Sequence, residues 1–80
     1  MMGLHLINAR KNRIIVCENL NYFWDEEELF DISSMWHEGN TVEEIAEYFK
    51  RDPDEVLIAL IHLAREDKIT RREGGLLLEH

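Results

Sequence analysis

The sequence predicts one small, mainly α-helical domain in which three helices pack beside a short β-sheet. Apolar residues recur at helical spacing between residues 25 and 66, and helix-capping residues stand where these stretches begin. Short β-branched runs lie on both sides of the helices and predict the sheet. Because 80 residues can build only one core, we expect a single domain over residues 13–77.

The two ends of the chain are expected to lie outside this domain. Residues 1–12 have weak patterning and are interpreted as a loose N-terminal arm. Residues 78–80 read Leu-Glu-His, which resembles the start of a vector-derived polyhistidine tag, so they are left out of the functional argument.

The first helix is predicted over residues 25–38. Asp25 is the expected N-cap, and the three glutamates that follow it interact favourably with the positive end of the helix dipole. Gly39 is expected to end the helix in a left-handed conformation. The predicted apolar stripe consists of Leu29, Ile32, Met35 and Trp36.

The second helix is predicted to begin after Thr41, because Thr41 and Glu44 have the spacing of a capping box. Its buried stripe consists of Val42, Ile45, Ala46 and Phe49.

A third helix is predicted from Pro53 to about Glu66, with Asp52 as its cap. Proline is tolerated at the first helical position because the amide hydrogen that it lacks has no partner there. The inner face is expected to consist of Val56, Ala59, Leu60 and Leu63, and the residues roughly opposite are Asp54, Ile58, Ile61 and Arg65.

The β-sheet is predicted from residues 13–18 and 68–72, with a turn at 73–75 and a return strand beginning at 76–77. Cys17 is expected to be a small buried hydrophobic residue of the first strand. A domain of this size needs large side chains in its core, so six aromatic residues are also expected to be buried: Phe23, Trp24, Phe30, Trp36, Tyr48 and Phe49.

The sequence resembles the helix-turn-helix family at residues 44–46, Phe49 and Val56, with Ala46 where the two helices would cross closely. Lys50 departs from the family, which often has a turn glycine at that point. Residues 63–76 look like the end of a recognition helix and the β-wing of winged helix-turn-helix transcription regulators. The resemblance covers about residues 25–77 and implies a regulator that binds double-stranded DNA, or a winged helix that docks on proteins.

Charge is distributed unevenly along the chain, whose formal net charge is −8. Residues 25–57 contain twelve acidic and two basic residues, whereas residues 1–24 and 58–77 are mildly basic. The resemblance places the third helix in the major groove, where its acidic first turn would repel phosphates. We therefore expect DNA contacts to be led by the wing and the arm. The candidate residues are Arg71, Arg72, Lys50, Arg51, Arg65 and Arg13, with Ile58 and Ile61 positioned for thymine methyl groups.

The alternative hypothesis is an acidic protein-interaction module or a homodimer. It uses the exposed apolar face of the third helix, through Ile58, Ile61, His62 and Asp54. Dimerisation through the edge of the strand at residues 13–18 is a further form of this hypothesis.

Other functional classes have little support in the sequence. There is no nucleophile–base pair, no glycine-rich phosphate loop and no cysteine–histidine spacing typical of zinc, so we expect no enzyme activity, cofactor, metal or small-molecule substrate. No apolar run approaches a membrane span. The single cysteine and the lack of an evident signal peptide favour a cytoplasmic protein.

Overall fold

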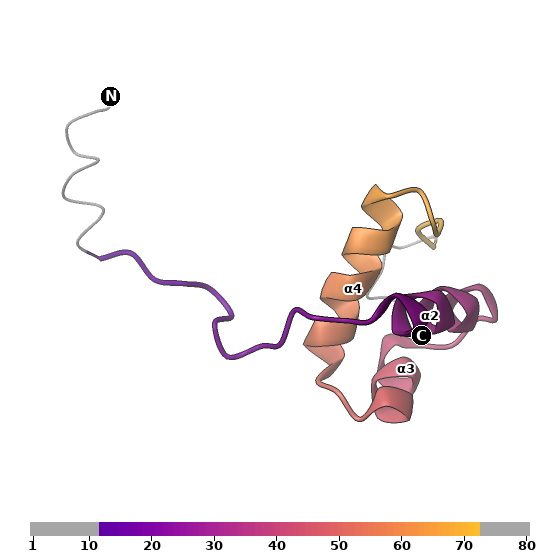
Figure 1. Ribbon diagram of the computed structural model, residues 1–80, viewed down its shortest axis with the longest axis horizontal. Coiled ribbons are helices and arrows are strands. Elements are labelled where there is room, and N and C mark those ends of the chain that lie inside the picture. Colours follow the sequence, from indigo (N-terminus) through magenta and orange to yellow (C-terminus); the bar gives the residue numbers. More distant parts are fainter. Residues whose placement is uncertain (1–11, 73–80) are drawn as a thin grey trace.

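The computed structural model describes residues 12–72, which form an all-α domain of three helices (Figure 1). They are α2 (Glu26–His37), α3 (Val42–Phe49) and α4 (Pro53–Arg65). Each helix packs against the other two. These bounds confirm the three predicted helices.

The helix ends follow the predicted capping residues. Thr41 Oγ1 accepts a hydrogen bond from the Glu44 amide at 3.0 Å, and the Glu44 carboxylate accepts one from the Thr41 amide at 2.9 Å. Asp52 Oδ1 accepts from the Asp54 amide at 2.8 Å, with Pro53 in the first turn. Gly39 has a φ of 94° after α2, as its left-handed role requires. Local chemistry thus determines where the helices begin and end.

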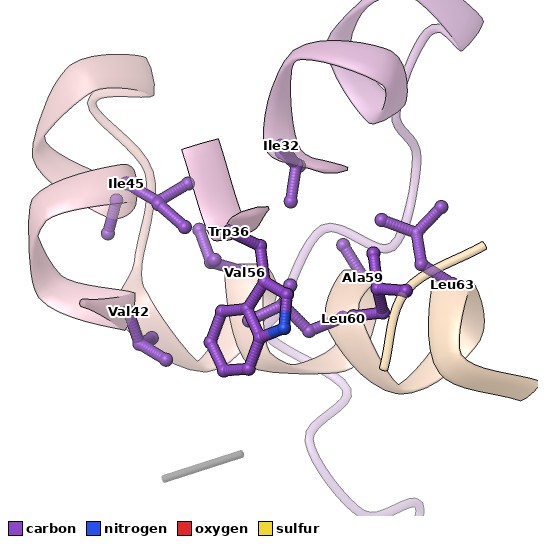
Figure 2. Close-up of a cluster of buried hydrophobic side chains, with 10 residues drawn as sticks. Ile32, Trp36, Val42, Ile45, Val56, Ala59, Leu60 and Leu63 are labelled. Atoms are coloured by element: carbon purple, nitrogen blue, oxygen red, sulfur yellow. The ribbon is translucent and has the colours of Figure 1, made fainter. Parts of the chain in front are cut away.

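The core lies where the three helices meet (Figure 2). The predicted inner face of α4 is buried in full, and Ala46 of α3 is 3% exposed, as expected of a small residue at a close contact. Ile69, which follows α4, adds one more buried side chain. The complete core consists of Ile32, Trp36, Val42, Ile45, Ala46, Val56, Ala59, Leu60, Leu63 and Ile69.

The predicted strands at residues 13–18 and 68–72 are wrong, since residues 12–72 contain no strand. A strand is stabilised by pairing, and Figure 1 shows the segment at residues 13–18 apart from the residues that follow α4. Residues 16–19 form a turn instead, and residues 70–72 are held against α2 by contacts described below. The predicted turn and return strand at 73–77, residues 1–11 and residues 78–80 lie outside the described residues.

Several apolar residues also lie at the surface against expectation. Cys17 is exposed and has a φ of 58°. Phe23, Phe30 and Tyr48 are 84%, 72% and 64% exposed. Trp36 alone among the aromatic residues of the described chain is buried, while Trp24 and Phe49 pack at the edge of the core. The core is therefore largely aliphatic, and most aromatic surface remains outside it.

Lys50, which ends α3, adopts the left-handed conformation with φ 57° and ψ 46°. This conformation costs a non-glycine residue about 1–2 kcal/mol, and part of that cost is recovered when glycine replaces it. We predict that Lys50→Gly raises the free energy of unfolding by about 0.5–1 kcal/mol in urea denaturation. Lys50→Ala, which removes the charge and keeps the Cβ, is the control and is expected to give no such gain.

Candidate functional site

A groove lies between α2 and α4 on the described surface. It consists of two adjoining hollows that share Leu29 of α2 and His62 of α4. We call it the α2–α4 groove and define it by Tyr22, Phe23, Leu29, Phe30, Ile58 and His62.

Aromatic side chains form the walls of the α2–α4 groove. Phe30 lies on the α2 side, and Tyr22 and Phe23 come from the connector at residues 20–25 that precedes α2. All three are at least half exposed. One end of the groove is charged, with Glu26 and Glu66 beside Lys68. The groove therefore has an apolar centre and a charged margin, which is the usual arrangement of a protein-binding surface.

Arg51 holds the connector in place. Its Nη2 donates hydrogen bonds to the carbonyl oxygens of Asn21 at 2.9 Å and Phe23 at 3.1 Å. Its Nε pairs with Glu55 Oε1 at 2.5 Å, and its guanidinium lies 3.7 Å from the centre of the Trp24 ring. These contacts fix the backbone that carries Tyr22 and Phe23, and these two side chains form one wall of the groove.

Glu55 completes this arrangement from the first turn of α4. Its Oε2 accepts a hydrogen bond from the Asn21 amide at 2.8 Å. This bond and, next, the bond from Arg51 lower the pKa of Glu55 below its ordinary value of 4.5, against a smaller opposing effect of burial. The connector is thus held by a charged pair, which we call the Arg51–Glu55 clamp.

Arg72 has a similar role at the other end of the described chain. Its Nη2 donates to the carbonyl oxygens of Trp36 and Asn40, each at 2.7 Å, and its guanidinium lies 3.4 Å from the centre of the Trp36 ring. The Trp36 indole donates to the Thr70 carbonyl oxygen at 2.9 Å. Residues 70–72 are therefore tied to the end of α2.

The residues predicted to contact DNA do not share one environment. Arg51 and Arg72 are engaged within the fold. Ile58 is partly buried in the α2–α4 groove, and Ile61 is 37% exposed. The remaining four residues are exposed at four separate places along the chain, namely Arg13, Lys50, Arg65 and Arg71.

Only some of the residues of the alternative, protein-interaction hypothesis lie together in the structure. Ile58 and His62 both line the groove, whereas Asp54 lies exposed in the first turn of α4. The sequence interpretation missed Tyr22, Phe23 and Phe30 as surface residues. The exposure of Phe30 could have been predicted from sequence, because Phe30 lies about 200° from Ile32 around the helix and therefore off the buried stripe.

Comparison with protein-family models, curated proteins and solved structures finds no match to this chain. No helix within residues 12–72 is long and apolar enough to cross a membrane. The same residues contain no group of three or more His, Cys, Asp or Glu side chains placed to hold a metal ion.

The two adjacent arginines at residues 71 and 72 provide a matched test of the contact with Trp36. Arg72→Ala removes two charge-assisted hydrogen bonds and the stacking on Trp36, so we predict a loss of about 2–3 kcal/mol in the free energy of unfolding. Arg71→Ala, at an exposed position, is expected to stay within about 0.5 kcal/mol of wild type. Equal losses in urea denaturation would contradict the assigned role of Arg72.

The Arg51–Glu55 clamp predicts a pH-dependent contribution to stability. Because folding lowers the pKa of Glu55, its carboxylate stabilises the fold above the unfolded-state pKa, and this stabilisation is lost as pH falls through the folded-state pKa. In urea denaturation, wild type is expected to exceed Glu55→Gln at pH 7, with the difference shrinking as pH falls below about 4.5. Glu43→Gln, at an exposed position of α3, controls for the loss of one negative charge.

Proposed function

We propose that this domain is a protein-interaction module that binds a short apolar segment carrying basic residues in the α2–α4 groove. The observation that carries the proposal is the concentration of exposed aromatic side chains around a hollow between two helices. Exposed apolar surface rimmed by polar residues is characteristic of protein contact sites, and aromatic residues are enriched where binding energy concentrates.

The charge of the domain supports a basic partner. Residues 18–72 contain fifteen acidic and six basic residues. Two of those six, Arg51 and Arg72, already donate hydrogen bonds inside the fold. A positively charged segment is therefore attracted to this surface over a distance of about one Debye length, roughly 8–10 Å in ordinary buffer.

Duplex DNA is the competing ligand, because α3 and α4 follow one another as the helices of a helix-turn-helix do. In that arrangement α4 enters the major groove with its first turn leading. Asp52 and Asp54 are exposed at this end of α4, and Glu43 and Glu47 are exposed on α3. These carboxylates oppose the counterion release on which DNA affinity depends, so the acidic surface favours the protein partner.

A peptide selection tests the proposed function. We predict that the full chain, immobilised and panned against a random peptide library, selects peptides that combine apolar residues with Lys or Arg. Phe30→Asp, at an exposed position of the groove, is expected to weaken the selected peptides at least tenfold. Tyr48→Asp is the matched control, because Tyr48 is exposed to a similar extent on α3 and does not line the groove.

The selection has two results that would overturn the proposal. One is the absence of enriched peptides when the immobilised chain is monomeric. The other is a gel-shift titration in which mixed-sequence duplex binds with a steep salt dependence while Phe30→Asp leaves peptide binding unchanged.

A further inference from the structure

We propose that the α2–α4 groove binds residues 13–16 of a second copy of this chain, so that two copies exchange these segments and form a dimer. The proposal rests on the proposed function, because it names the occupant of the same groove. It joins two features that have no partner among residues 12–72: an apolar segment and an apolar groove.

The segment at residues 13–16 is apolar and exposed. The side chains of Ile14, Ile15 and Val16 are 83%, 73% and 76% exposed. Consecutive exposed aliphatic residues of this size are rare on monomeric surfaces unless they mark a contact site. Figure 1 shows this part of the chain leading away from the three helices.

The turn at residues 16–19 directs the segment away from its own groove. The Leu20 amide donates to the Cys17 carbonyl oxygen at 3.1 Å, and the Tyr22 hydroxyl donates to the same oxygen at 2.7 Å. Cys17 has the left-handed φ of 58°. Tyr22 is itself a wall of the groove, so the turn is fixed to the groove wall. In this conformation none of residues 13–16 lines the groove of its own chain, whereas a second copy's groove is accessible with the turn intact.

Opposite charges favour the same pairing. Residues 1–17 contain Arg10, Lys11 and Arg13 and no acidic residue, so they carry a charge of +3. Residues 18–72 carry −9. Glu26 and Glu66 stand at the margin of the groove, where the partner's Arg13 would enter with its aliphatic neighbours.

Two copies are enough to fill every groove. Each chain has one segment and one groove, so a twofold axis brings both pairs together at once. Two reciprocal contacts also act together, because formation of the first raises the effective concentration for the second. A dimer is therefore the expected assembly, with no free segment left to recruit a third copy.

Light scattering after size exclusion tests the stoichiometry with the full chain. We expect wild type to have twice the monomer mass of 9.5 kDa. Ile15→Asp in the segment and Phe30→Asp in the groove are each expected to raise the dissociation constant at least tenfold. Tyr48→Asp, which places the same charge on α3, is expected to remain a dimer. All three positions are exposed, and circular dichroism checks that each variant is folded.

Mixing the two disabled variants tests which surfaces pair. The Phe30→Asp chain keeps an intact segment, and the Ile15→Asp chain keeps an intact groove. We therefore expect the mixture to form a heterodimer, and to contain more dimer than either variant does alone. A photoreactive label on Cys17, the only cysteine of the sequence, then reports the contact. With one copy labelled with ¹⁵N, the crosslinked peptides are expected to join different copies and to map to α2 or α4.

Each other outcome overturns the proposal. A monomer whose Cys17 label crosslinks within one copy shows self-docking, and a dimer that survives Ile15→Asp uses another surface. A monomer that still selects library peptides through Phe30 overturns the exchange and leaves the proposed function standing. A monomer that selects no peptides removes both.

Discussion

The ion pair between Arg51 and Glu55 is the contact on which the candidate site depends. These two residues lie one turn apart, where the α3–α4 turn leads into α4, and they hold the connector by hydrogen bonds to the backbone of Asn21 and Phe23. Without them the core helices still have their own caps and apolar faces, but the backbone that carries Tyr22 and Phe23 loses these hydrogen bonds and keeps only the packing of Trp24 against the core. The clamp therefore contributes both to the stability of the fold and to the shape of the groove.

Two arginines hold the segments on either side of the small helical core, namely the connector at residues 20–25 and residues 70–72. Arg51 and Arg72 each lie over a tryptophan and donate to two carbonyl oxygens from a single nitrogen. The planar guanidinium stacks and donates at the same time, which the compact ammonium group of lysine does not do. The consequence is electrostatic as well as structural, because two half-buried cations are engaged in contacts within the fold, and the remaining surface is more strongly acidic than the composition suggests.

The helices were predictable from sequence because their signals are local. Thr41 and Glu44 are three residues apart, and the buried face of α4 follows from helical spacing alone. The strands were not predictable, because β-branched residues at 14–16 favour a strand only where a partner lies beside them. The two arginine contacts join residues about thirty positions apart, and no local pattern indicates them. Ile58 and His62 could be placed from the helical wheel, but the connector that completes their groove could not.

The exposed aromatic surface follows from the size of the chain. Seven aromatic residues stand in 80, and the core formed by three short helices is filled mainly by Ile, Leu, Val and Ala. Two aromatic rings, Trp24 and Phe49, meet edge to face at 5.3 Å on the margin of that core. Tyr22, Phe23 and Phe30 therefore remain outside, and because the connector runs beside α2 and α4 they lie around one hollow. A larger domain would bury these rings. In this one their burial requires a second surface, and for that reason the proposed binding site is the groove and not α4 alone.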